Sequence, residues 1–103
     1  MIGNSRPPNV DICTQAAKQD IADLKSRLEK GVSVPAHTVK DAVDSTNKLF
    51  YSVVQCLHDS HGPAALAEAR SLLFELEPLV PHECEQQRKK VESLLDLCER
   101  IQA

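Results

Sequence analysis

The stretch PAHTVKDAVDSTNKLFYSVVQCLH, residues 35–58, decides the fold. Its apolar residues recur every three or four positions, which is the period of an amphipathic α-helix and not of a strand. The apolar stripe covers about 160° of the helix surface, which is wide enough to contact two neighbouring helices. Pro35 suits the first helical position, where its missing N–H would have no partner. We therefore predict a central, well-buried helix with the inward-facing residues Val39, Ala42, Val43, Thr46, Leu49, Phe50, Val53, Val54, Cys56 and Leu57.

Outside this stretch, three further segments show the helical period, and breaks rich in proline or glycine separate them. The additional helices are predicted over residues 11–30, 63–77 and 81–102. Asp11 would cap the first of them, and Gly31 would end it in the left-handed conformation. Short connections force consecutive helices to run antiparallel. The sequence thus predicts an all-α fold, an antiparallel up-down four-helix bundle over residues 10–103, after a disordered lead in residues 1–9.

The first and the last of these helices differ in the width and regularity of their apolar stripes. The stripe of the first helix is only about 80° wide, so we expect this helix to contribute the least burial and to be the most easily displaced. The last helix has the a/d rhythm of a coiled coil, with spacings of three and four residues between Cys84, Gln87, Val91, Leu94, Cys98 and Ile101. Leu97 lies at the edge of that stripe, where it is expected to pack against a neighbour.

Charge and composition exclude several classes of function. The formal net charge is −3, and acidic residues flank the basic run at residues 88–90. A nucleic-acid partner is therefore not expected, because phosphate binding requires a basic field. No apolar stretch is long enough to span a membrane, and the N-terminus lacks the apolar core of a secretory signal. We expect a cytoplasmic protein, with the nucleus as a possible alternative location.

The four cysteines are interpreted as reduced, buried side chains. Cys84 and Cys98 would lie on one helix about 21 Å apart along its axis, too far for a disulfide. A metal site remains an alternative, because Cys13, Cys56 and Cys98 fall at one end of the predicted bundle together with His58 and His61. The closely spaced cysteine pairs of structural zinc sites are absent from the sequence. We predict neither a metal nor another cofactor.

The sequence carries no recognisable catalytic apparatus. Asp59, Ser60 and His61 are the residue types of a hydrolase triad, but adjacent residues cannot form that relay, which is assembled from separate elements. There is no glycine-rich phosphate loop, and most acidic residues fall on outward faces, where nothing would shift their pKa. We therefore predict that the protein is not an enzyme.

One aromatic side chain lies on the side of its helix opposite the predicted core. Phe74 points away from the core stripe of the third helix, and the residues around it on that face are uncharged: Pro63, Ala67, Ser71 and Pro78. A second apolar strip on an already buried helix is uncommon on a free surface. Such a strip fits a partner-binding face, while the alternatives are a central third helix or a kink at Pro78 that turns Phe74 inward. Tyr51 lies outside its own stripe and is a secondary candidate, with a core-edge tyrosine as the alternative.

Together these observations predict a non-enzymatic protein–protein interaction module of an adaptor, scaffold, trafficking or signalling protein. It would dock an amphipathic helical segment on the exposed face that carries Phe74, Ala67, Ser71 and Pro78, with Tyr51 contributing. Two alternatives stay open. One is a homo-oligomeric structural subunit, for example a homodimer, and the other is a bundle that binds a small ligand or a metal.

Overall fold

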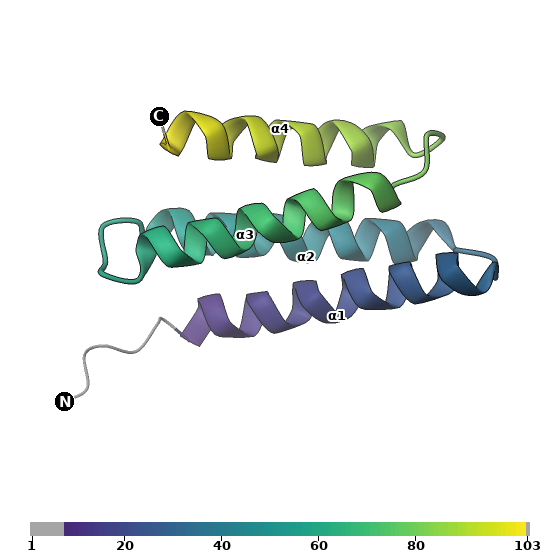
Figure 1. Cartoon of the computed structure of the whole chain (residues 1–103), viewed down its shortest axis with the longest axis horizontal. Coiled ribbons are helices and arrows are strands. Elements are labelled where there is room, and N and C mark those ends of the chain that lie inside the picture. The colour runs from purple at the N-terminus through teal and green to yellow at the C-terminus, as the bar shows by residue number, and fades with distance from the viewer. Residues whose placement is uncertain (1–7, 103) are drawn as a thin grey trace.

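The computed structural model describes residues 8–102 and contains, within them, four α-helices and one short 3₁₀ turn. The elements are α1 (Pro8–Lys30), α2 (Ala36–Gln55), α3 (Gly62–Leu76), η1 (Glu77–Leu79) and α4 (Glu85–Gln102). Consecutive helices run antiparallel, so the predicted up-down four-helix bundle is confirmed (Figure 1). No strand forms among the described residues. The described helices also include none that is both long and apolar enough to cross a membrane.

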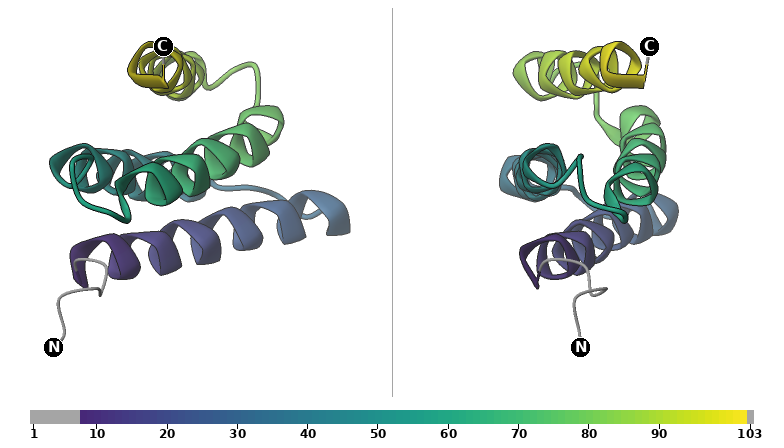
Figure 2. Two further views of the ribbon diagram at one scale, coloured as in Figure 1. Left: turned by 60° about the vertical axis from the view of Figure 1, so that its left-hand side comes forward. Right: turned by 90° about the vertical axis from the view of Figure 1, so that its left-hand side faces the viewer.

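The bundle is flattened, with α2 and α3 side by side in the middle. α1 covers this pair on one side and α4 covers it on the other, and α1 and α4 do not pack against each other (Figure 1; Figure 2, right). The molecule measures 47 × 28 × 17 Å along its principal axes. As a result, α2 and α3 each keep one outward face, and these two faces lie on opposite sides of the molecule.

The first two helices begin at different residues from those predicted. α1 starts at Pro8, so Asp11 lies within its first turn and the prediction that Asp11 caps the helix is wrong. Pro35 precedes α2 as its N-cap, with an extended ψ of 148°, instead of occupying the first helical position. The predicted role of Gly31 is confirmed, because it follows α1 with a φ of 70°. The predicted disordered lead is wrong for residues 8 and 9, which belong to α1, and its residues 1–7 lie outside the described part of the chain.

The other boundaries also move, chiefly around the prolines. α2 ends at Gln55 and not at residue 58. α3 ends at Leu76, and the 3₁₀ turn η1, which contains Pro78, follows it directly in place of a kinked helix. α4 begins at Glu85 and not at residue 81, because a turn intervenes in which the Cys84 N–H donates to the Pro81 carbonyl at 3.0 Å. The Cys84 carbonyl then accepts the Arg88 N–H at 3.0 Å, the first bond of the helix.

Gly62, the first residue of α3, is required by close backbone packing. A Cβ atom at this position would lie 2.6 Å from the carbonyl oxygen of Cys56. Real Cβ atoms do not approach an oxygen so closely, and backbone atoms cannot move aside as a flexible side chain can. The turn between α2 and α3 therefore tolerates only glycine here, which brings the end of α2 directly against the start of α3.

The core is continuous through all four helices and is almost entirely aliphatic. Its largest fully buried side chains are Phe50, Ile21, Leu24, Leu49, Leu73, Leu76, Leu94, Val10, Val39, Val43, Val53 and Val91. The few buried hydroxyl groups bond within their own helices: Thr14 donates to the Val10 carbonyl at 2.7 Å, and Thr46 donates to the Ala42 carbonyl at 2.8 Å. The core thus contains few polar side chains.

The prediction that the first helix contributes the least burial is wrong. Five of its residues are buried, namely Val10, Thr14, Ala17, Ile21 and Leu24, whereas only Val91, Leu94 and Cys98 are buried on α4. Polar contacts also connect α1 to its neighbours. The Ser45 hydroxyl of α2 donates to the Asp20 carboxylate, and Lys18 forms an ion pair with Glu68 of α3 at 3.2 Å. The weakly buried outer helix is α4.

Candidate interaction surfaces

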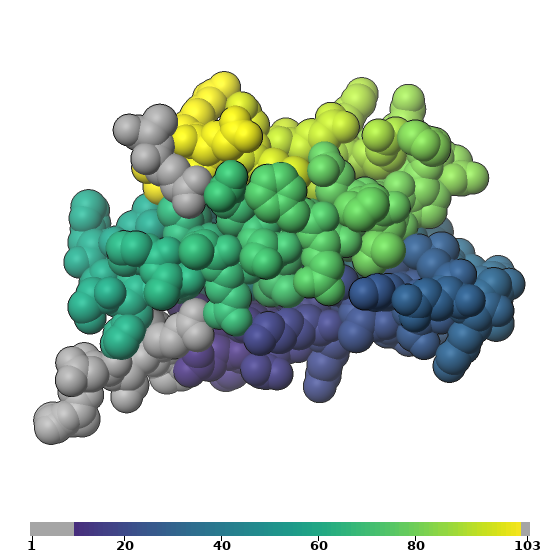
Figure 3. Space-filling model, in the orientation of Figure 1, coloured from purple at the N-terminus to yellow at the C-terminus, as the bar shows by residue number. Residues whose placement is uncertain are grey.

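The outward face of α3 carries the residues singled out from the sequence. Phe74 is 48% exposed, and Pro63, Ala67, Ser71 and Pro78 are exposed as well. We call these five residues the α3 face. Figure 3 shows α3 uncovered between α1 and α4 on this side of the molecule. The alternative in which a kink at Pro78 turns Phe74 inward is therefore wrong. The other alternative, a central α3, is correct for the position of the helix but does not bury Phe74.

Arg70 holds the Phe74 ring in place from one turn earlier on α3. Its guanidinium carbon lies 5.1 Å from the ring centroid, a cation–π contact. The Nε atom of Arg70 is enclosed without a hydrogen-bond partner among the described residues. Arg70 forms no ion pair within residues 8–102, although Glu75 and Glu77 are exposed nearby on the chain. The five residues of the α3 face are uncharged, and the cation of Arg70 lies beside its one aromatic ring.

The charge of Arg70 also acts on the buried Cys98 thiol of α4. Burial raises the pKa of the Cys98 thiol above its ordinary value, and the positive charge of Arg70 opposes this effect by a smaller amount. A buried thiol with a raised pKa stays protonated near neutral pH and is a poor nucleophile. Cys98 is therefore a packing residue at the α3–α4 interface.

Tyr51, the secondary candidate, does not join the α3 face. It lies on α2, whose outward face is on the other side of the molecule, and it is 52% exposed, with its ring 6.1 Å from that of Phe50 in an edge-to-face contact. Further exposed apolar residues are Val54 of α2 and Leu97 and Ile101 of α4. We call Tyr51 and these three the exposed apolar residues of α2 and α4. Each of the last three remains 36–37% exposed.

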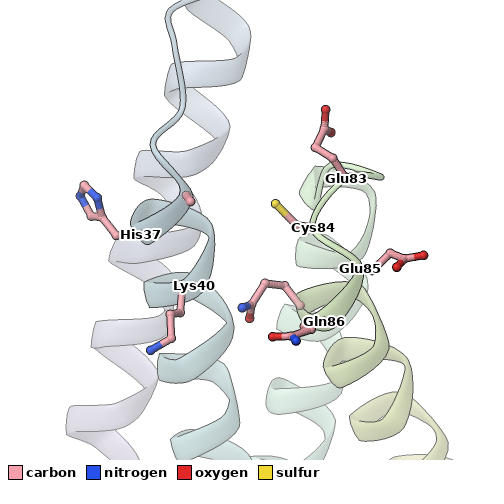
Figure 4. A pocket seen from close by; sticks show the side chains of 8 residues that line it. His37, Lys40, Glu83, Cys84, Glu85 and Gln86 are labelled. Atoms are coloured by element: carbon pink, nitrogen blue, oxygen red, sulfur yellow. The ribbon is translucent and has the colours of Figure 1, made fainter.

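Two recesses lie beside α4. The first, of about 550 Å³, lies between the beginnings of α2 and α4, and its lining includes Lys40, Glu83, Cys84 and Glu85 (Figure 4). The second, of about 630 Å³, lies between the α2–α3 turn, the beginning of α3 and the end of α4. Its lining is mostly apolar and consists of Leu57, His58, Pro63, Leu66 and Ile101.

Sequence reasoning placed some of the exposed apolar residues of α2 and α4 in the core. Val54 and Ile101 were predicted to face inward and Leu97 to pack against a neighbour, but each keeps more than a third of its surface exposed. A signal was present in the width of the α2 stripe. The apolar stripe of α2 is about 160° wide, and α4 contacts only a narrow part of α2. Part of the stripe therefore stays uncovered. Leu28, also predicted to face the core, is 41% exposed near the end of α1.

The structure does not assemble the alternative metal site. Among the described residues, no three histidine, cysteine, aspartate or glutamate side chains come together in a position to hold a metal ion. Cys13 instead contacts the Ser52 hydroxyl across the α1–α2 interface, with 3.7 Å between sulfur and oxygen. All four cysteines are free thiols. The predicted absence of a disulfide between Cys84 and Cys98 agrees with this.

Comparisons of the chain with known protein families, with curated proteins and with solved structures find no significant match. The surface geometry is therefore the only basis for a function.

Proposed function

We propose that this chain is a non-enzymatic protein-interaction module of an intracellular adaptor, scaffold, trafficking or signalling protein. Its α3 face docks an amphipathic helical segment of a partner. The observation that carries the proposal is the exposure of Phe74, whose ring stands half uncovered on an uncharged strip while the core closes without it. An aromatic ring in such a position is the typical anchor of a protein interface.

The chemistry of the α3 face suits a helix as its occupant. Ser71 and Ala67 lie one and two turns before the ring, and their small side chains let a second helix backbone approach closely. Covering the exposed half of the Phe74 ring would contribute about 2 kcal/mol of binding free energy. Arg70 restrains the ring before binding, so little side-chain entropy is lost when the partner arrives.

Phe74→Asp tests the proposal directly, with Ile12→Asp as the matched control. Both substitutions place a carboxylate at an exposed apolar position, since Ile12 of α1 is 66% exposed. We expect the wild type and Ile12→Asp to retain the same partner in affinity capture, identified by mass spectrometry, whereas Phe74→Asp loses it. Circular dichroism must show that all three proteins fold. Loss of the partner in both variants, or its retention in Phe74→Asp, would contradict the proposal.

Self-association is the competing explanation for an exposed apolar strip, and sedimentation separates the two. We expect a monomer at all concentrations when the protein is alone. A dimer that Phe74→Asp dissociates would mean that a second copy covers the α3 face, which would replace the external partner with a homodimer.

A further inference from the structure

We infer that α4 is a detachable cover, and that the surface of α2 and α3 beneath it is a second binding site, independent of the α3 face. The occupant is a helix of a partner protein that presents α4's own pattern, two aliphatic residues and a small one at the spacing of Val91, Leu94 and Cys98. Three features of the molecule support a detachable cover: the few side chains that hold α4, the unpaired polar atoms beneath it and the recesses at its ends.

Few buried side chains hold α4 against the rest of the bundle. Within residues 85–101, only Val91, Leu94 and Cys98 are buried, and Leu95 is partly buried beside them. No described side chain in this range forms a hydrogen bond or an ion pair with another helix. Because the gain from burial scales with the apolar area removed from water, α4 detaches at a lower cost than α1, which buries five residues.

Two buried polar atoms on the helices that α4 covers have no hydrogen-bond partner in the described part of the chain. They are Oδ1 of Asn47 on α2 and Nε of Arg70 on α3. Asn47 lies two turns after Lys40, on the face of α2 that meets the beginning of α4 at the first recess. The charge of Arg70 acts on Cys98 of α4. A buried polar group without a partner opposes burial, so a helix that offers these atoms a hydrogen bond would bind here better than α4 does.

The two recesses show that α4 does not close fully against its neighbours at either end. The first lies between the beginnings of α2 and α4 (Figure 4), and the second lies at the end of α4, beside the α2–α3 turn. The second recess has a mostly apolar lining, to which α4 contributes Ile101, still 37% exposed. A partner helix with a larger apolar residue at the position of Ile101 would fill more of this recess than α4 does, which favours the partner over the cover.

A short hinge separates α4 from the firmly packed part of the chain. Val80, directly after η1, is buried, and residues 81–84 connect it to α4. His82 and Glu83 in this connection are exposed, so their backbone angles can change without disturbing the core. Arg88 contacts the His82 ring at 2.6 Å, which joins the connection to α4 and not to α3. Since α1, α2 and α3 contact one another directly, they stay packed when α4 swings away.

The tether makes α4 a competitor of any partner helix. It raises the effective concentration of α4, and the apparent affinity of a partner is its intrinsic affinity multiplied by the fraction of molecules in which α4 is open. A substitution that weakens the hold of α4 therefore strengthens partner binding, whereas a similar substitution on α1 does not. Exchange of α4 between two copies requires two such openings, so we expect the protein alone to remain monomeric.

Thiol labelling of the full chain measures the opening of α4. Cys98 is fully buried, and Thr46→Cys places a matched thiol at a fully buried position of the central helix α2. A pulse of iodoacetamide, followed by trypsin digestion and mass spectrometry, reads the two thiols separately, because trypsin releases residues 41–48 and 91–100 as different peptides. We expect Cys98 to be labelled about thirtyfold faster than the control thiol. Equal rates would overturn the inference, because α4 would then open only when the whole domain unfolds.

A labelled peptide of residues 81–103 serves as the partner helix, and fluorescence anisotropy measures its binding to the full chain. We expect Leu94→Ala in the full chain to strengthen binding about tenfold, and Leu24→Ala, the matched truncation on α1, to leave it unchanged. Val91→Ala should strengthen binding about threefold, and it keeps the test valid if Leu94→Ala does not fold. In the peptide itself, Leu94→Asp should abolish binding and Ile101→Phe should strengthen it about threefold.

Phe74→Asp should leave both thiol labelling and peptide binding unchanged, which separates this inference from the proposed function of the α3 face. Several binding results would overturn the inference: no binding of the peptide to the wild type or to Leu94→Ala, equal strengthening by Leu24→Ala, or no gain from Ile101→Phe in the peptide. A dimer in sedimentation that Leu94→Ala promotes would also overturn it, because the occupant would then be α4 of a second copy.

Discussion

The two outer helices, α1 and α4, cover the same central pair but are held very differently. α1 buries residues along most of its length and is linked to α2 and α3 by the contacts of Asp20 and Lys18. On α4, burial is confined to Val91, Leu94 and Cys98. Between residues 85–101 and the other helices, the described side chains form no hydrogen bond or ion pair. The difference teaches that the regularity of an apolar stripe does not measure how much of it is buried.

Small residues explain how a narrow stripe produces the better interface. Ala17 of α1 and Ala42 of α2 are both fully buried, and elsewhere along the same interface Cys13 contacts Ser52. Short side chains let two helices approach closely, which brings their backbones and many atoms into contact. α4 instead places long polar side chains such as Gln87 and Arg88 at its partly buried edge. The regular spacing of apolar residues on α4 therefore does not produce close packing against its neighbours.

The largest expected effect comes from truncating one buried leucine on each outer helix. We expect Leu24→Ala on α1 to lower the free energy of unfolding by about 3–4 kcal/mol. Leu94→Ala should cost about 2–3 kcal/mol, because a loosely held helix can move to fill the cavity. Urea unfolding followed by circular dichroism measures both values. A greater loss for Leu94→Ala would reverse the ranking of the two helices.

Hydrogen exchange measures the same difference without a mutation. We expect backbone amides in the middle of α4 to exchange through openings about 2 kcal/mol less costly than those of α1, or about thirtyfold faster. Native-state exchange followed by NMR or mass spectrometry resolves the two helices. Equal protection would show that both detach only when the whole domain unfolds.

Polar contacts give a smaller effect. Ser45→Ala removes the hydrogen bond that Asp20 accepts across the α1–α2 interface, and we expect a loss of about 1 kcal/mol. Asp96→Asn removes the exposed ion pair with Arg100 of α4, 3.0 Å long, and should cost less than about 0.5 kcal/mol. Thermal and urea unfolding compare the two. Similar losses would mean that the link between α1 and α2 does not stabilise the fold.

The smallest effect is a pH dependence at Cys98. The pKa of this thiol is raised in the folded state above the ordinary value of 9.0. Above pH 9 the unfolded chain releases the proton while the folded chain retains it, so this stabilising contribution is present below pH 9 and is lost as the pH rises. We expect stability to fall more steeply above pH 9 in the wild type than in Cys98→Ala, by urea unfolding at several pH values. Identical slopes would contradict burial of the thiol.

The sequence predicted the candidate α3 face better than the exposed apolar residues of α2 and α4. Phe74 could be identified because it lies nearly opposite the core stripe, so no arrangement of neighbours covers it easily. Val54, Leu97 and Ile101 lie at the edges of their stripes, where burial depends on how close the next helix comes. Tyr51 was grouped with Phe74 although their helices expose opposite sides of the molecule. Helical periodicity describes one helix at a time and does not give the position of its neighbours.

The sequence by itself determined the helices, their order and their antiparallel course, because period, breaks and short connections are local properties of the chain. Gly31 shows this clearly, since its left-handed conformation follows from one residue type at one position. Only the tertiary structure decided that α1 is the firmly held outer helix and that Val54, Leu97 and Ile101 stay partly exposed. These outcomes depend on interhelical distances, which are set by side-chain packing between residues that are distant in the sequence.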